Sequence, residues 1–421
     1  MKTVEQKTKR VPAIRFAGFD DEWVEKKLGE MASFSKGMGY SKGDLKENGT
    51  PIVLYGRLYT KYETIISDVD TFADAKSNSV YSKGGEVIVP GSGETAEDIS
   101  IASVVKKSGV LLGGDLNVIT PPKNLDSVFL AISISNGKPH SDMAKMAQGK
   151  SVVHLHNTDL AEINLPYPNI IEQQKIGSFF SNIDSLISLE QKKYDKLTQV
   201  KKSMLEKMFP KEGATVPEIR FTGFSRNWVW KELDDIIVRI ATGLNPRDNF
   251  KLNSGGSNYY VTIKNFEHGH LYLDEKCDRI DDCALQLIQV RSDLQKDDLL
   301  FSSIGRIGDC YLIKNNPQNW NINESVFTLR PNKAIAASNY LFHVVHCDIV
   351  LSQILDSVTG STFKSIKIGD LKKALIPIPC KEEQIQIANY LDNLDSLISL
   401  QQRKLEKLKN IKKSLLEKMF V

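Results

Sequence analysis

Four histidines stand in His-x-His pairs, the arrangement in this chain that most suggests a metal ligand set. The pairs are His154/His156 and His268/His270. If each pair lies on a strand, alternation places both imidazoles on one side of it. A zinc site needs three or four ligands, and no third ligand is identifiable for either pair. We therefore predict no metal site.

Signatures of a catalytic centre are missing from the sequence. A methyltransferase acting on an exocyclic amine needs an Asn/Asp-Pro-Pro-Tyr/Phe loop, and the nearest match, Asn164-Leu-Pro-Tyr167, lacks the first proline. The glycines at residues 91–93 are isolated turns rather than a dinucleotide fingerprint, and no phosphate-binding GxxxxGK[ST] loop is present. We predict a non-catalytic chain that carries no cofactor of its own.

The remaining chemistry is charge and hydrogen bonding on loops between expected strands. Arg and Lys can bind guanine, Asn and Gln can bind adenine, and hydroxyl or basic side chains can bind phosphate. For any one such residue, a solvated loop position is an equally good interpretation. The candidate DNA contacts are Lys36, Tyr40, Lys42, Arg57, Tyr59, Ser92 and Lys138 in the first half, and Thr242, Asn245, Arg247, Lys264, Asn265, Ser303, Arg306 and Lys364 in the second.

Composition limits how the chain could bind nucleic acid. The 421 residues are 41% hydrophobic, enough for two or three domains, and the net charge is only +3. Phosphate neutralisation provides most non-specific DNA affinity, so we expect weak DNA binding by the isolated chain. Five cysteines without a CxxC pair, no long apolar run and no signal-like start predict a cytoplasmic protein without a membrane span.

The chain is a tandem duplication. The motif Val-Pro-x-Ile-Arg-Phe-x-Gly-Phe occurs at residues 11–19 and 216–224, an offset of 205 (216 − 11). The motif Leu-Glu-Lys-Met-Phe occurs at residues 205–209 and 416–420, an offset of 211 (416 − 205). The ends of the two copies match closely while their middles barely match. A duplicated chain segment with conserved ends and divergent middles suggests two domains of one geometry that recognise two different ligands.

Each copy ends in a long helix, expected over residues 171–209 and 381–420. Apolar residues recur there at alternating spacings of three and four, the seam of a coiled coil. We expect the two helices to pair antiparallel; packing of each onto its own globular domain is the alternative. Glu190 and Gln401 interrupt the seams near their midpoints, and we predict that they lie near the crossing point and help to set the register.

The segments before each helix are expected to be mixed α/β. Short runs rich in Val, Ile and Tyr predict strands over residues 51–55, 86–89, 109–112 and 116–120, with a helix over 126–135. In the second copy, residues 259–263, 298–302, 310–313 and 325–329 are expected to play the same parts in that order, with a helix over 339–345. The fold class is therefore α/β mixed (α+β), duplicated about a pseudo-twofold axis.

Together these motifs resemble the specificity subunit of type I restriction–modification systems. The resemblance is carried by the doubled motif at residues 11–19 and 216–224, the helix starts Glu172-Gln-Gln-Lys175 and Glu383-Gln-Ile-Gln386, and the paired endings. It implies target-recognition domains at 11–168 and 216–379 and conserved helical regions at 169–210 and 380–421. Each recognition domain would read one half of a bipartite DNA target.

The resemblance also implies partners. The helices would space the domains and dock two DNA methyltransferase subunits, with restriction subunits added for cleavage. S-adenosylmethionine, ATP and Mg²⁺ would then be bound by those partners. The alternative is a coiled-coil scaffold whose two domains bind protein partners rather than DNA.

Overall fold

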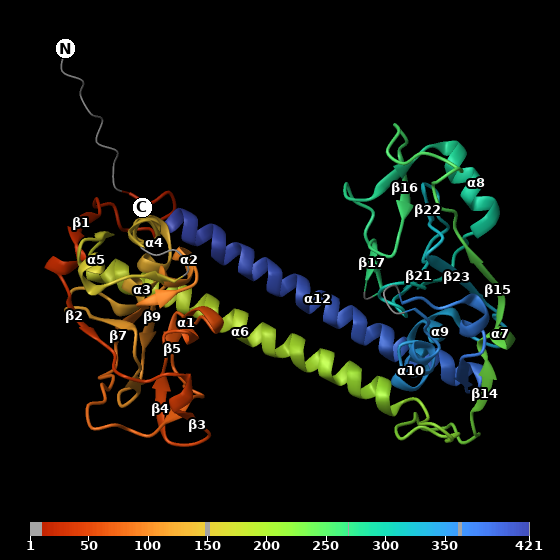
Figure 1. Ribbon diagram of the computed structural model, residues 1–421, viewed down its shortest axis with the longest axis horizontal. Helices are drawn as coiled ribbons and strands as arrows, with labels where there is room; N and C mark the ends of the chain where they lie inside the picture. Colours follow the sequence, from red (N-terminus) through yellow and green to blue (C-terminus); the bar gives the residue numbers. More distant parts are fainter. Residues whose placement is uncertain (1–10, 148–151, 268, 361–363, 421) are drawn as a thin grey trace, which may run out of the picture. The chain divides into compact units, whose positions relative to one another are not determined.

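The computed structural model describes residues 11–147, 152–267, 269–360 and 364–420 (Figure 1). The chain divides into two compact units: the first unit comprises Met1–Lys192 and Arg403–Val421, and the second comprises Lys193–Gln402. The two long helices are α6 (Ile170–Lys207) and α12 (Lys381–Met419), and each unit contains a part of both. Among the described residues, no helix is long and apolar enough to cross a membrane.

The first unit is built on a five-stranded sheet covered by helix α3 (Ser127–Ser135), whose residues 129–134 are buried. The strand order is β2-β11-β7-β9-β5. A four-stranded sheet, β10-β4-β6-β3, lies beside it. The strands are β2 (Ser33–Lys36), β3 (Leu45–Lys46), β4 (Thr50–Val53), β5 (Ile65–Ile66), β6 (Phe72–Ala73), β7 (Glu86–Pro90), β9 (Ser103–Val105), β10 (Leu111–Leu112) and β11 (Leu116–Thr120).

The second unit repeats this plan with a four-stranded sheet in the order β15-β23-β20-β21, packed against helix α9 (Ser338–Val344). A three-stranded sheet, β19-β16-β22, accompanies it, together with helix α8 (Asp282–Ser292). The strands are β15 (Ile237–Thr242), β16 (Asn258–Val261), β19 (Asp278–Ile280), β20 (Leu299–Ser302), β21 (Cys310–Leu312), β22 (Trp320–Ile322) and β23 (Val326–Pro331).

Strand pairing confirms most of the expected strands and corrects one correspondence. In the first unit β10 pairs parallel with β4, and in the second β22 pairs parallel with β16. Strand β21 instead pairs antiparallel with β20, as β9 does with β7. Residues 310–313 therefore correspond to β9, not to residues 109–112. Short apolar runs of this kind look alike in sequence, so only the pairing separates them.

The repeated motifs meet one another inside each unit. Arg15 donates two hydrogen bonds to the fully buried carboxylate of Glu172, at 2.6 and 2.7 Å. Arg220 does the same to Glu383, at 2.7 and 2.8 Å. The next residue, Gln173, accepts from the backbone N–H of Asp126 at 2.9 Å, and Gln384 accepts from that of Ala337 at 2.9 Å. The shared motifs thus anchor the start of each long helix to its globular domain.

The repeated Leu-Glu-Lys-Met-Phe ending packs against a tryptophan, Trp23 or Trp228, that follows the first motif of each copy at the same distance. In the first unit the ring of Phe420 lies 6.2 Å from Trp23 and 5.8 Å from Phe129 between centroids. In the second unit Phe209 lies 6.2 Å from Trp228, and it lies 5.9 Å from Tyr340. The phenylalanine that follows the long helix of one copy therefore completes the core of the other copy's globular domain.

Substitution of Arg15 by Ala tests this anchor. It leaves the Glu172 carboxylate buried without its partner, and we expect a loss of about 3 kcal/mol in the free energy of unfolding. The matched control is Lys27→Ala, which removes an exposed pair with Glu162 and should cost less than about 1 kcal/mol. Urea unfolding of the full chain measures both, and equal losses would contradict the prediction.

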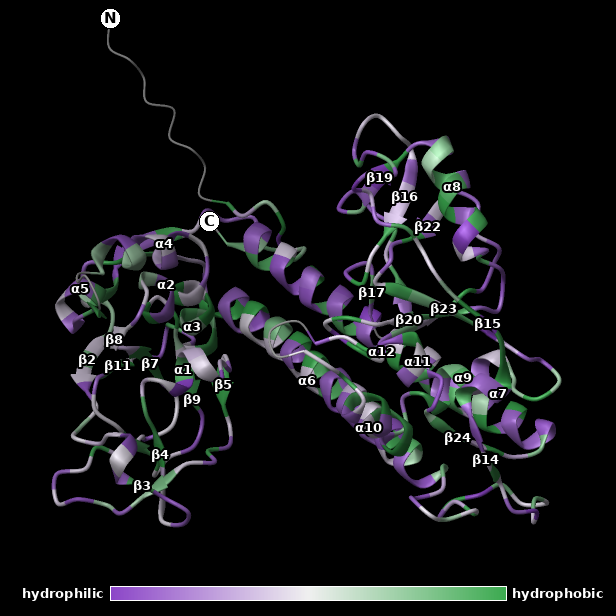
Figure 2. Cartoon of the chain, turned by 45° about the vertical axis from the view of Figure 1, so that its right-hand side comes forward, coloured by the Kyte–Doolittle hydropathy of each residue, from purple (hydrophilic) through white to green (hydrophobic). Residues whose placement is uncertain are grey.

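The two long helices pair antiparallel, as expected. In the first unit Asp184 of α6 pairs with Lys412 of α12 at 2.5 Å, while Glu190 pairs with Lys404 at 2.9 Å. The partner's number falls as the α6 number rises, which defines the antiparallel direction. Around each helix, hydrophobic and hydrophilic residues alternate (Figure 2). In the second unit the seam continues with Lys201, which pairs with Asp395 at 2.5 Å.

The alternative of packing onto the globular domain is also realised, at the helix ends. Ile176 and Phe180 of α6 share one buried apolar cluster with Phe129 of α3. Ile387 and Leu391 of α12 likewise lie in the buried apolar cluster of the second unit. The two modes coexist because different turns of one helix present apolar residues to different neighbours.

His346 in the second unit predicts a pH dependence of stability. Burial lowers the pKa of His346 from 6.5 to about 4. Below pH 6.5 the unfolded chain therefore binds a proton that the folded chain does not, and stability is lost as the pH falls toward 4. Between pH 7 and pH 5 this loss is about 2 kcal/mol. Denaturant unfolding of His346→Gln should show that much less pH dependence than the parent chain; an unchanged difference would refute the assignment.

Candidate nucleic-acid interface

One edge of the main sheet gathers polar side chains in the first unit. There β2 ends at Lys36, which lies opposite Asn117 at the start of β11, and β7 ends opposite Leu116. Directly after β7, Ser92 of the short strand β8 (Ser92–Gly93) pairs with His154 of β12 (Val153–His154). Lys36, Ser92 and His154 therefore lie at the same edge although they are far apart in sequence.

The second unit presents the same edge with different side chains. Strand β15 ends at Thr242, opposite Phe327 of β23, and β20 ends at Ser302, opposite Val326. The next residues again bridge to a late segment of the unit, through Ile304 and Ser365. We call this position in each unit the strand-end edge. It is where the two copies share backbone geometry and differ in side-chain chemistry.

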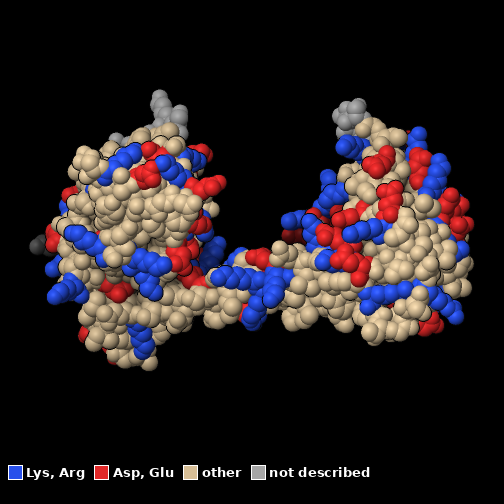
Figure 3. Space-filling model, turned by 90° about the horizontal axis from the view of Figure 1, so that it is seen from below, with Lys and Arg blue, Asp and Glu red and all other residues tan. Residues whose placement is uncertain are grey.

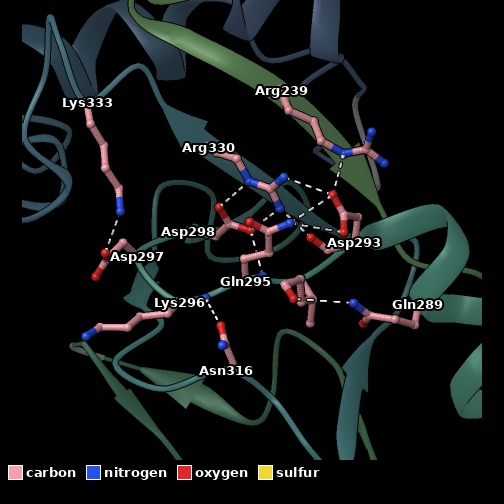
Figure 4. A network of polar contacts seen from close by, with 11 residues as sticks. Arg239, Gln289, Asp293, Gln295, Lys296, Asp297, Asp298, Asn316, Arg330 and Lys333 are labelled. Atoms are coloured by element: carbon pink, nitrogen blue, oxygen red, sulfur yellow. Dashed lines mark hydrogen bonds and ion pairs between the residues drawn. The ribbon is translucent and has the colours of Figure 1, made fainter.

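A partly buried ion-pair network lies at the other end of the second unit's strands (Figure 4). Arg330 of β23 donates to both carboxylate oxygens of Asp298, at 2.8 and 2.9 Å, and to Asp293 at 2.9 Å. Hydrogen bonding to Asp298 raises the pKa of Arg330, and hydrogen bonding from Arg330 lowers the pKa of Asp293. Because Asp298 precedes β20 while Ser302 ends it, the network links β23 to β20 at the end opposite the strand-end edge.

Three of the candidate residues come together in the second unit. Arg306 donates to the carbonyl oxygens of Ile263 and Phe266 at 3.0 and 2.9 Å, which places it beside Lys264. The neighbouring Gly305 lies next to the backbone of Lys364. Lys264 and Lys364 are exposed, and Arg306 also pairs with Glu267 and Asp309 at 2.8 Å each. Because the two carboxylates offset the charge of Arg306, the exposed Lys264 and Lys364 provide the positive charge of this Lys264–Arg306–Lys364 cluster, and lysines are suited to phosphate.

Several candidates in the first unit are held by internal contacts. Tyr40 is buried, and its hydroxyl bonds to Ser79 at 2.5 Å and accepts from the N–H of Lys76. The guanidinium of Arg57 pairs with Glu63 and Asp70. Ser92 is buried and donates to Asp115. Tyr59 is half-buried, and burial raises its pKa.

Several candidates of the second unit are also held by internal contacts. Asn265 accepts from the N–H of Thr262 and donates to the Cys277 sulfur, so it shapes its turn. Ser303 is buried and donates to the carbonyl of Ser325 at 2.8 Å. Thr242 accepts from Arg291 at 3.2 Å. Asn245, which is half-buried, accepts through its carbonyl from the Asn249 side chain at 3.0 Å.

The candidates best placed to meet a ligand are basic and exposed. Lys138 is exposed but pairs with Glu25 at 2.9 Å. For the others, the described part of the chain shows no side-chain hydrogen bond or ion pair. They are Lys36, Lys42, Arg247, Lys264 and Lys364.

The sequence assigned no role to the histidine pair of the first unit, and the structure places His154 at the strand-end edge. His154 and His156 are exposed, with parallel rings whose centroids are 6.4 Å apart. No group of three or more His, Cys, Asp or Glu that could hold a metal occurs among the described residues. His268 of the second pair lies outside them. The sequence could have indicated His154 as an edge residue, because the repeat offset of 211 (365 − 154) aligns it with Ser365.

The seam residues Glu190 and Gln401 fall in different units. Glu190 is buried despite its charge, and its carboxylate accepts from Lys404 at 2.9 Å. Gln401 is half-buried on α12. A buried polar residue in an otherwise apolar seam can specify register, and that role for Glu190 stays a prediction. That Glu190 and Gln401 meet at the crossing point stays a prediction.

Comparison with known proteins agrees with this geometry. The type I restriction modification DNA specificity domain matches the chain twice, over residues 20–199 and 225–410. The chain therefore belongs to this family, as a non-catalytic specificity subunit.

Individual relatives are distant but extensive. A putative type I restriction enzyme MjaX specificity subunit of Methanocaldococcus jannaschii is 24% identical over 319 residues, covering 74% of this chain and 71% of that protein. The EcoKI specificity subunit of Escherichia coli K12 is 24% identical over 354 residues, covering 77% and 74%. The crystal structure of an S subunit from M. genitalium shares the fold, with a TM-score of 0.59 at 14% identity over 98% of this chain and 99% of that one.

Proposed function

We propose that the strand-end edge of each unit reads one half of a bipartite DNA target, and that the antiparallel helices set the spacing between the half-sites. The observation that carries the proposal is the duplicated edge. Lys36 and His154 in the first unit are replaced by Thr242 and Ser365 at the equivalent positions of the second. A shared backbone arrangement that carries different side chains is suited to two domains that bind different DNA sequences.

The proposed partners follow from the family. Two methyltransferase subunits would dock on the helices and carry S-adenosylmethionine, and restriction subunits would supply ATP- and Mg²⁺-dependent cleavage. Those subunits would also supply positive charge, since this chain's net charge is only +3 and phosphate contacts dominate DNA affinity. DNA-binding experiments therefore need the methyltransferase present.

Lys364→Ala tests the role of the second unit's edge. We expect it to weaken DNA binding by the methyltransferase complex and to reduce the slope of log affinity against log salt by about 0.9, the value for one phosphate contact. The control is Lys333→Ala, another exposed lysine of the same unit, which pairs with Asp297 near the opposite end of the sheet. Fluorescence anisotropy at several salt concentrations measures both. Equal slopes for the two variants would refute a phosphate contact at Lys364.

A further inference from the structure

A cavity of about 490 Å³ lies in the first unit, where the end of α12 meets the globular domain. One wall is formed by α12, and another by the loop before β5 and the start of helix α4 (Gly137–Met146). Binding sites for small molecules measure roughly 300 to 1,000 Å³, so the cavity has the size of such a site. The lining residues that could bind a ligand are Tyr62, Asn136, Lys409, Lys412 and Lys413.

Two of the three lysines have no internal partner. Lys412 pairs with Asp184 of α6 at 2.5 Å, and the same carboxylate accepts from Thr64 at 3.0 Å. Lys409 and Lys413 are four residues apart, which places them on one face of α12. Both are exposed, and in the described ranges of the chain neither shows a side-chain hydrogen bond or ion pair.

The lining as a whole is weakly positive. Glu417 lies one turn beyond Lys413 and also lines the cavity, so three lysines face two carboxylates and the net charge of the lining is +1 (3 − 2). Lys and Arg side chains gather along the helical part of the surface in Figure 3, and exposed lysines on a helix are ordinarily solvated. The charge by itself therefore marks no site; what distinguishes Lys409 and Lys413 is the cavity beside them.

The wall facing these lysines provides groups suited to a planar base. Tyr62 is 40% exposed and donates a hydrogen bond to the hydroxyl of Ser135 at 3.1 Å, which orients its ring. The side-chain amide of Asn136 donates to the carbonyl oxygen of Ile132 at 2.9 Å, and no described residue donates to its oxygen. Aromatic rings stack on nucleobases, and the amide of Asn can pair with the edge of adenine.

The two copies differ in this lining. At the repeat offset of 211 (409 − 198), Lys409 corresponds to Thr198. At the same offset Asn136 corresponds to Cys347, which is buried. The second unit therefore lacks one of the two unpaired lysines as well as the amide, and a ligand that needs both should bind once for each chain.

We propose that this cavity binds one nucleoside phosphate, with its phosphate group at Lys409 and Lys413 and its base against Tyr62 and Asn136. Charge-assisted hydrogen bonds from lysine to phosphate are among the strong ones in proteins. A ligand that binds only the folded state stabilises it by mass action, and this ligand links α12 to α4 and to the loop before β5. The cavity shares no residue with the strand-end edge, so the inference does not depend on the function proposed above.

Isothermal titration calorimetry of the full chain with AMP as the probe tests the proposal. The parent chain should bind one AMP. Adenosine and inorganic phosphate should each bind at least roughly 10-fold more weakly, because each fills only part of the site. Lys409→Thr, which introduces the residue of the second unit, should weaken AMP binding about 10-fold, and Lys409→Thr combined with Lys413→Ala about 100-fold.

The matched control is Lys407→Ala with Lys418→Ala. Both are exposed lysines of α12 in the first unit that lie outside the lining, so this pair should bind AMP as the parent chain does. Because all the substituted lysines are exposed, every variant should melt with the parent chain. If a cavity variant melts earlier, Tyr62→Leu takes its place, since it removes the stacking ring and should weaken AMP binding about 10-fold.

Three results would overturn the proposal. The first is no binding of AMP by the parent chain, and the second is equal weakening by the cavity pair and the control pair. The third is unchanged AMP affinity but weaker DNA binding by the methyltransferase complex after substitution of Lys409 and Lys413, which would assign both lysines to DNA phosphates. The salt dependence of Lys364→Ala tests the strand-end edge independently, so the failure of one proposal is distinguishable from the failure of the other.

Discussion

Exchange of residues 24–167 for the equivalent segment of a relative with another target should change one half of the methylated DNA sequence and leave the other half unchanged. The segment begins with β1 (Val24–Lys27) and ends with β13 (Asn164–Tyr167). These strands pair antiparallel, with Val24 opposite Tyr167, so both ends of the exchanged segment lie together. Trp23, Arg15 and Glu172 remain outside it and keep the shared frame intact.

The reciprocal exchange is the matched control. Residues 229–378 are bounded by the equivalent pair, β14 (Val229–Glu232) and β24 (Leu375–Ile378), with Val229 opposite Ile378. This exchange should alter the other half of the target. Long-read sequencing of methylated adenines reads out both exchanges. A change in both halves after a single exchange, or in neither half, would contradict the division of recognition between the units.

Leu391→Asp should unfold the second unit. Leu391 of α12 is fully buried in an apolar cluster that includes Ile387, Met208 and Tyr340. A carboxylate there has no partner, and the cost is expected to be about 5 kcal/mol, a large part of the stability of a domain. Hydrogen exchange should show lost protection over residues 216–402, while the first unit, with its own core around Phe129 and Trp23, keeps its protection.

Leu397→Asp provides the control for that substitution. Leu397 lies on the same helix but is half exposed, so an aspartate there remains solvated and should leave protection in both units nearly unchanged. Equal loss of protection from the two substitutions would contradict the prediction, because burial of Leu391 would then not be what stabilises the second unit.

The duplicated frame was predictable because it depends on patterns that sequence displays directly. The two long helices follow from apolar periodicity, and most strands follow from short β-branched runs. Antiparallel pairing was expected from the pseudo-twofold relation, and the ion pairs of Asp184 and Glu190 with α12 confirm it. The motif Val-Pro-x-Ile-Arg-Phe revealed the duplication, but its role could not be predicted from the sequence. The partner of Arg15, Glu172, lies 157 positions away.

The candidate contacts were harder to predict because loop conformation decides them. Tyr40 and Ser303 lie in polar, glycine-containing segments that look solvent-exposed in sequence, yet both side chains are buried and hydrogen bonded. Arg306 satisfies two carbonyl groups as well as two carboxylates. Lys264 and Lys364 have no sequence pattern that brings them together; the turn containing Gly305 does so through long-range backbone contacts.

The most direct test of the account is a map of methylated adenines in cells that carry the methyltransferase subunit, with and without this chain. We expect methylation of one bipartite sequence, two short specified halves separated by unspecified bases, only when the chain is present. Methylation at the same sites in its absence, or a methylated target with a single undivided recognition sequence, would contradict recognition by two separate units.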